Sequence, residues 1–101
     1  MKVVITSQSL DRLEESLLFY IEELGISIEK VSEIKTQLLN RARSLPESPY
    51  IGQLEPDLKK FNKNHRRLIQ GNFKIIYRVE EEFIYVTDFF DSHKNPTKMK
   101  E

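Results

Sequence analysis

The sequence contains no cysteine and few residues that break regular structure, with 3 Gly and 4 Pro among 101 residues. Without cysteine there is no disulfide framework, no thiolate nucleophile and no cysteine-based zinc site, so we expect neither a metal nor a cofactor. Hydrophobic residues make up 39% and charged residues 32%, a balance typical of folded globular proteins. A chain of this length has room for one modest core, so we expect a single domain over residues 1–101.

Long apolar runs are also missing. A membrane-spanning helix needs about 20 consecutive apolar residues, and no stretch of this chain approaches that length. The first residues, from Met1 to Thr6, become polar too early for a secretory signal. We therefore expect a cytoplasmic protein without membrane contact.

One segment lacks acidic residues, although the formal net charge of the whole chain is zero. Between Lys59 and Arg78 there are seven lysines and arginines, together with His65, and no aspartate or glutamate. Between Asp11 and Lys35, in contrast, there are seven acids and three bases. This segregation gives residues 59–78 a positive field that can attract a polyanion or an acidic partner.

The first half of the chain shows helical periodicity after a short β-branched run at residues 2–6, which predicts a strand. Apolar residues then recur every three or four positions in two segments. They predict one helix over about residues 8–24, ended by Gly25, and a second one from Ser27 to Pro46. Because the connection is so short, we expect the two helices to form an antiparallel hairpin.

The second half is rich in β-branched and aromatic residues. Residues 46–64 lose periodicity and predict a loop with one helical turn near residues 56–61. Three runs that predict strands follow, at residues 65–70, 73–79 and 83–90. Gly71-Asn72 predicts a two-residue hairpin turn. The element order β-α-α-β-β-β indicates an α+β fold, in which the helix hairpin packs on one face of a three-stranded antiparallel meander.

The hairpin turn also determines which side chains share a face of the sheet. Pairing Gln70 with Phe73 places the apolar side chains on one face, which should receive the helices: Leu68, Phe73, Ile75, Tyr77 and Val79. The opposite face should display four basic side chains, His65, Arg67, Lys74 and Arg78, around Ile69 and Ile76. We call it the basic face. A one-sided sheet always turns some polar residues to water, but a merely solvated face usually mixes both signs of charge. The basic face is therefore a candidate functional surface.

Residues 91–101 form a polar tail that contains Asn95-Pro96, a signal for a turn or a helix start. We interpret this tail as mobile.

The run from His65 to Val79 resembles the central hairpin of RelE/ParE toxins, in which a basic strand and a tight turn lead to a strand ending in Tyr-Arg-Val. The flanking segments agree over nearly the whole chain: Tyr20 to Gly25, Leu45-Pro46, Gly52, and Phe90 to Pro96. The resemblance implies the toxin of a type II toxin–antitoxin pair, neutralised by an antitoxin encoded beside it. That antitoxin would cover either the acidic and apolar groove of the helices or the basic face.

Two activities occur in this superfamily. Members like RelE cleave messenger RNA on the ribosome, whereas members like ParE poison DNA gyrase. Cleavage by the 2′-hydroxyl needs a proton acceptor, a proton donor and cations, without a metal. The resemblance would assign these roles to five residues: His65, Arg67, Lys74, Arg78 and His93.

The sequence departs from the ribonuclease pattern at two positions. Lys74 replaces a typical arginine, and Ser92-His93 stands where arginine is frequent. A lysine cannot make the two-pronged contact of a guanidinium with phosphate. The long helices, the Glu23-Leu24-Gly25 ending and the run from Arg66 to Gly71 resemble the ParE branch more. Gyrase poisoning is thus favoured, and the alternatives are a ribosome-dependent endoribonuclease and a degenerate copy that only binds antitoxin.

Overall fold

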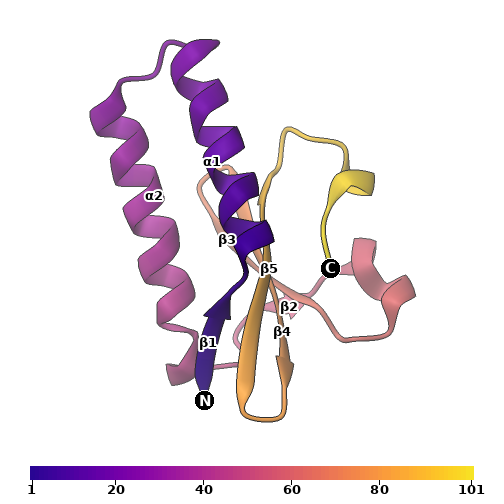
Figure 1. Cartoon of the computed structure of the whole chain (residues 1–101). Coiled ribbons are helices and arrows are strands. Elements are labelled where there is room, and N and C mark those ends of the chain that lie inside the picture. Colours follow the sequence, from indigo (N-terminus) through magenta and orange to yellow (C-terminus); the bar gives the residue numbers. More distant parts are fainter.

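Two helices form a hairpin against one face of a five-stranded sheet in the structure, a computed structural model that describes residues 1–101 (Figure 1). The helices and strands follow one another in this order: β1 (Lys2–Ile5), α1 (Ser7–Glu22), α2 (Ile28–Arg43), β2 (Gln53–Leu54), β3 (Arg66–Gln70), β4 (Phe73–Glu80) and β5 (Phe83–Asp91). Three short 3-10 helices complete the chain: η1 (Leu45–Glu47), η2 (Pro56–Phe61) and η3 (Pro96–Lys98). The predicted α+β fold with an antiparallel helix hairpin is confirmed.

Side-chain caps determine where both helices begin. The Thr6 hydroxyl oxygen accepts a hydrogen bond from the backbone N–H of Ser9 at 3.1 Å, and the Ser27 hydroxyl oxygen accepts one from Lys30 at 3.1 Å. Between the helices Gly25 adopts a φ of 65°, the left-handed conformation that its lack of a side chain permits. The chain therefore reverses within a few residues. Neither helix is long and apolar enough to cross a membrane.

The sheet contains more strands than the predicted meander, in the order β1-β5-β4-β3-β2. The β3–β4 register is as predicted, from Gln70 opposite Phe73 to Arg66 opposite Tyr77. On one side β1 pairs in parallel with β5, and on the other side β2 pairs antiparallel with β3. The two outer strands therefore widen a three-stranded meander into a mixed sheet.

A bulge in β5 reverses the alternation of its side chains. Ile76 pairs with Asp88 and the next residue, Tyr77, pairs with Val86, so Thr87 is an extra residue without a partner on β4. As a result Val86 and Phe89 both belong to the core under the helices. The bulge also sends Phe90 to the opposite face of the sheet, where it packs with Ile76.

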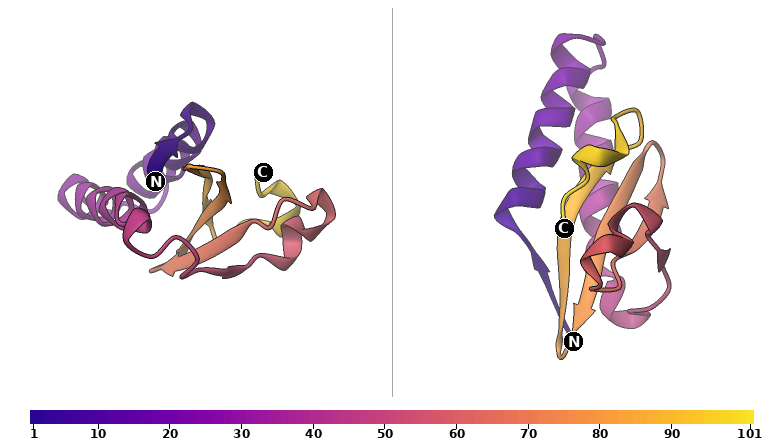
Figure 2. Two further views of the ribbon diagram at one scale, coloured as in Figure 1. Left: turned by 90° about the horizontal axis from the view of Figure 1, so that it is seen from below. Right: turned by 90° about the vertical axis from the view of Figure 1, so that its right-hand side faces the viewer.

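Both faces of the sheet are covered, as the view from below shows (Figure 2, left). The main core lies between the helices and the sheet and includes Leu13, Leu38 and Tyr77. A smaller cluster on the other face joins side chains from η2, the sheet and the C-terminal segment: Leu58, Ile76, Phe90 and Met99. The prediction that the basic face surrounds an open apolar patch is therefore wrong for Ile76, which is fully buried. The physical reason is that η2 and the C-terminal segment fold over that patch.

The C-terminal segment makes specific contacts with the sheet and with α1. The Lys100 N–H donates to the Asp88 carboxylate at 2.9 Å, and the Thr87 hydroxyl donates to the Lys100 carbonyl at 3.1 Å. The Arg12 guanidinium donates to the carbonyl of Lys98 at 2.9 Å. These bonds hold residues 98–100 against the sheet. The mobility of the tail in solution stays a prediction.

Gly52 lies so close to the backbone of Arg67 and the side chain of Tyr77 that no larger residue fits at this position. A Cβ at this position would lie 2.7 Å from the Arg67 carbonyl oxygen and 2.7 Å from the Tyr77 hydroxyl oxygen. The Gly52 N–H also donates to that hydroxyl oxygen at 2.9 Å, which gives the buried phenol oxygen a hydrogen-bond donor. We expect Gly52→Ala to lower the free energy of unfolding by about 1–3 kcal/mol through overpacking, as measured by urea denaturation. Gly25→Asn is the control, because nothing lies within 4 Å of its Cβ position and asparagine is one of the few residues that adopt the left-handed φ found there; an equal loss in both variants would show that overpacking is not the cause.

Candidate functional site

The structure brings four of the five predicted site residues to one face of the sheet. Arg67 lies on β3, Lys74 and Arg78 lie on β4, and His65 immediately precedes β3. Strand alternation and the β3–β4 register place them on the face opposite the helices, as the sequence predicts. The basic face therefore exists, but its charges have partners that the sequence did not reveal.

Glu55 supplies the acid that the basic segment lacks. Its side chain is fully buried, and one carboxylate oxygen lies 3.2 Å from the Lys74 ammonium nitrogen and 4.0 Å from Nε of Arg67. The other oxygen accepts from the N–H of Asp57 at 3.0 Å and so caps η2. Glu55 precedes the acid-free segment 59–78 in the sequence, and the fold places its carboxylate next to Arg67 and Lys74. The Glu55 carboxylate therefore offsets one of the two positive charges of Arg67 and Lys74, and this part of the basic face keeps a net charge of one.

The remaining donors of Arg67 are directed at β2. Its guanidinium donates to the Leu54 carbonyl at 2.7 Å and to the Gln53 side-chain oxygen at 3.3 Å. Arg67 also lines a hollow of about 460 Å³ beside the basic face, together with Lys59 and His65. Lys59 is exposed and makes no ion pair, so it gives this hollow a positive charge without an acidic partner.

His65 lies beneath the C-terminal segment with only 2% of its surface exposed. Its Nε2 lies 3.0 Å from the carbonyl oxygen of Glu101, and because that oxygen can only accept, Nε2 carries the hydrogen. Nδ1 is then an unprotonated acceptor, and it has no hydrogen-bond partner. Burial lowers the pKa of His65 below its usual value, and Arg78 and Lys63 lower it further against the opposing effect of Glu101. The imidazole is accordingly neutral at pH 7.

The lowered pKa of His65 makes stability depend on pH. Between the folded-state pKa and 6.5 the unfolded chain binds a proton that the folded chain does not. The free energy of unfolding should therefore be fully retained above pH 6.5 and fall as the pH is lowered through this window. Urea midpoints measured from pH 7.5 to 5.5 should show this slope for the natural chain and a flatter one for His65→Gln, whose amide can still donate to Glu101. Parallel slopes would contradict the assignment.

Arg78 is held by its own strand and by β5. Its guanidinium pairs with the Glu80 carboxylate and lies over the ring of Tyr85, with Cζ 4.6 Å from the ring centroid. Arg78 also lies close enough to His65 to affect its pKa. These contacts orient the side chain along the sheet.

His93 lies apart from the other four residues. It follows β5 at the end of the sheet where Asp91 pairs with Phe73, and its imidazole Nδ1 lies 2.9 Å from the Asp91 carboxylate. The other oxygen of that carboxylate accepts from the Tyr20 hydroxyl at 2.9 Å, which places the group on the helix side of the sheet. Burial, followed by the Asp91 contact, raises the pKa of Tyr20. The His93 side chain is 71% exposed and faces solvent, not the basic face.

Sequence reasoning did not predict the burial of three acids, Glu55, Asp88 and Asp91. Asp88 is fully buried in β5, and its carboxylate lies 2.9 Å from Nε of Arg12 on α1. The signal in the sequence was a single acid within the apolar run 83–90, where an unpaired carboxylate would be costly. For Glu55 the signal was an acid directly before Pro56, a typical position for capping a helical turn.

The fold and the hairpin register agree with a match to a known family. The sequence profile described as "ParE toxin of type II toxin-antitoxin system, parDE" matches residues 3–96, which include both helices and every strand except the first residue of β1. The chain belongs to the ParE toxin family. The resemblance to RelE/ParE toxins is thereby confirmed, and a cognate antitoxin is the partner that a type II toxin implies. No individually curated protein matches this ParE-family toxin.

Proposed function

We propose that this toxin arrests growth in the cytoplasm by binding and poisoning DNA gyrase, and that its antitoxin relieves the arrest. The observation that carries the proposal is the position of the Glu55 carboxylate, buried between Arg67 and Lys74. A ribonuclease would need both cations to stabilise the charge that develops on phosphate, whereas here the Glu55 carboxylate lies against both and offsets one of their two positive charges.

Two further contacts support a binder over a nuclease. His65 is covered by the C-terminal segment, so an RNA hydroxyl reaches its imidazole only if that segment moves. His93 lies on the helix side of the sheet, bound to Asp91, and is not grouped with the other four residues. The acid, base and cations required for cleavage by the 2′-hydroxyl are thus not gathered around one open site.

An endoribonuclease is the second candidate, and one observation favours it. His65 is neutral at pH 7, as a general base must be before it accepts a proton. Movement of the C-terminal segment would expose this imidazole beside Arg67 and Lys74. In that case the four basic positions on the sheet would act together, without a metal.

Induced expression in cells without the antitoxin distinguishes the two candidates. Gyrase poisoning predicts growth arrest with chromosomal DNA breaks covalently linked to gyrase, while mRNA stays intact in the first minutes. Cuts in the ribosomal A-site codon without such breaks would support the ribonuclease. Unchanged growth at a verified toxin level would contradict both and favour a degenerate copy that only binds antitoxin.

A further inference from the structure

Unpaired positive charge gathers where η2 leads into β3, over residues 59–66, which we call the η2–β3 corner. Four bases of this corner make no ion pair: Lys59, Lys60, Lys63 and Arg66. Two acids without an ion pair lie nearby, Asp57 on η2 and Glu101, whose carbonyl oxygen lies 3.0 Å from His65. The bases outnumber these acids, so the corner keeps a positive field that attracts an anion.

Two hollows adjoin at the η2–β3 corner. One has a volume of about 310 Å³ and is lined by Tyr50, Leu54, Asn64, Arg66 and Val79. The other is the hollow of about 460 Å³ beside the basic face, and it shares Leu54 and Asn64 with the first. Glu55 is the single acid in the two linings, and it is buried against two bases of the basic face. No unpaired carboxylate in these linings therefore repels an anion.

An exposed aromatic ring with a cation close to it accompanies each hollow. Tyr50 lines the first hollow and is 60% exposed, with Cζ of Arg66 5.2 Å from its ring centroid. Phe61 directly precedes Asn62, which lines the second hollow, and Nζ of Lys60 lies 5.4 Å from the Phe61 ring centroid. A nucleobase stacks on such a ring or on a guanidinium, while the neighbouring cation attracts its phosphate.

The backbone gives the η2–β3 corner a defined shape. Asn62 and Asn64 have φ values of 56° and 54°, a left-handed conformation that asparagine adopts more readily than most residues. Both line the second hollow, and their amide groups can donate to and accept from the edge of a base. Arg66 is held by its Nη1, which donates to the Gly52 carbonyl at 2.7 Å. Its other two nitrogens make no hydrogen bond within the protein.

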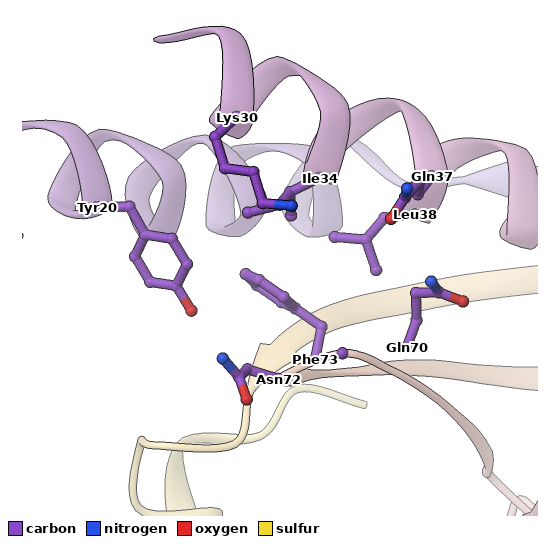
Figure 3. A pocket seen from close by; sticks show the side chains of 9 residues that line it. Tyr20, Lys30, Ile34, Gln37, Leu38, Gln70, Asn72 and Phe73 are labelled. Carbon is purple, nitrogen blue, oxygen red and sulfur yellow. The ribbon is translucent and has the colours of Figure 1, made fainter. Parts of the chain in front are cut away.

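The hollow between α2 and the β3–β4 turn has a different character (Figure 3). The figure shows Ile34 and Leu38 pointing from the helix toward Phe73 on the sheet. Lys30 is the single charged residue in this lining, and its Nζ lies 3.9 Å from the carboxylate of Glu33. This hollow therefore has no unpaired cation to hold a phosphate, in contrast to the two hollows at the η2–β3 corner.

We propose that single-stranded DNA binds along the two hollows of the η2–β3 corner, with a base stacked on Tyr50 and phosphates held by Lys59 and Arg66. The choice of DNA rests on the proposed function, because gyrase brings DNA to a toxin that is bound to it. The strand is single because the bases of a duplex stack on one another and leave no face for an aromatic side chain. Tyr50, Lys59 and Arg66 lie outside the five residues that the resemblance assigns to RNA cleavage.

Fluorescence anisotropy of a labelled oligothymidine of about 12 nucleotides tests this site. We expect the purified toxin to bind it with a Kd of about 1–100 µM at physiological salt. Tyr50→Ala should weaken binding about 5–100-fold, whereas Tyr50→Phe, which keeps the ring, should bind like the natural chain. Tyr50 is exposed, so both variants should keep the natural circular-dichroism spectrum.

The charge contribution is tested by Lys59→Glu. It should weaken binding and lower the slope of log affinity against log salt by about 0.7, because one phosphate contact is lost. Lys2→Glu is the matched control, since Lys2 is also exposed and unpaired but lies on β1, at the opposite edge of the sheet. On the natural chain, amide chemical-shift changes caused by oligothymidine should centre on Tyr50, Asn64 and Arg66.

Several outcomes would overturn the inference. They are no binding at 100 µM toxin, about the upper limit expected here, full affinity of Tyr50→Ala, equal losses in Lys59→Glu and Lys2→Glu, or shift changes away from the corner. Tighter binding of a duplex, or binding of oligouridine without oligothymidine, would overturn it as well. Supercoiling assays keep the two proposals apart. Gyrase inhibition without oligothymidine binding would contradict only this inference, and binding without inhibition would contradict only the proposed function.

Discussion

Replacing Arg12 with methionine should lower the free energy of unfolding by about 3–5 kcal/mol at pH 7.5, because it leaves the Asp88 carboxylate unpaired in the interior. Asp88 is fully buried, and Arg12, with 16% of its side chain exposed, is its charged partner. The Lys100 N–H would be the remaining donor to this carboxylate. Methionine keeps the aliphatic part of the arginine side chain, so the loss reports on the guanidinium, which pairs with Asp88 and also donates to the Lys98 carbonyl.

The sign of the pH dependence identifies the group responsible. Burial raises the pKa of Asp88, and the N–H of Lys100 and the guanidinium of Arg12 oppose that shift. Without Arg12 the pKa should rise further, so the folded chain binds a proton that the unfolded chain releases. The stability of Arg12→Met should therefore decrease as the pH rises from about 4, near the unfolded pKa, through the raised value.

Two controls accompany this measurement by urea denaturation. The double variant Arg12→Met/Asp88→Asn should regain much of the lost stability, because no unpaired charge remains. Lys35→Ala, which breaks the exposed pair with Glu14, should change the free energy of unfolding by less than about 1 kcal/mol. An Arg12→Met loss no larger than that of Lys35→Ala would show that Asp88 does not depend on its partner.

The second large expected effect concerns Lys74→Gln and His93→Gln. Each variant is assayed for inhibition of gyrase supercoiling and for RNA cleavage. If the toxin poisons gyrase by binding, both folded variants should inhibit supercoiling at the same concentration as the natural chain. If it cleaves RNA with these residues, removing one acid–base or charge-stabilising group should reduce cleavage by about 10²–10⁴-fold. The comparison uses purified variants with matched circular-dichroism spectra. Loss of gyrase inhibition in both variants would show that gyrase poisoning requires these two side chains, contrary to this prediction.

Local chemistry made most of the fold predictable. Ser27 and Gly25 determine where α2 begins and how the chain reverses, and Gly71-Asn72 sets the register that distributes side chains between the two faces of the hairpin. The pairings that were missed depend on residues distant in the sequence. β1 joins β5 across about eighty residues, and β2 has only two residues, too few to show an alternating pattern.

The composition of the site was only partly predictable for the same reason. Alternation along two adjoining strands placed Arg67 and Lys74 on one face, which the structure confirms. Their partner is Glu55, which lies between β2 and η2 and contacts them only through the tertiary fold. The bulge at Thr87 likewise determines which side chains cover Ile76. Charge counts along a segment therefore identified the positions of the bases but not their partners.

Gyrase poisoning is tested most directly by adding the purified toxin to DNA gyrase and relaxed plasmid in the presence of ATP. We expect loss of supercoiling and accumulation of linear DNA covalently bound to gyrase, both reversed by stoichiometric antitoxin. Full supercoiling at micromolar toxin, together with new cuts in mRNA on translating ribosomes, would contradict it.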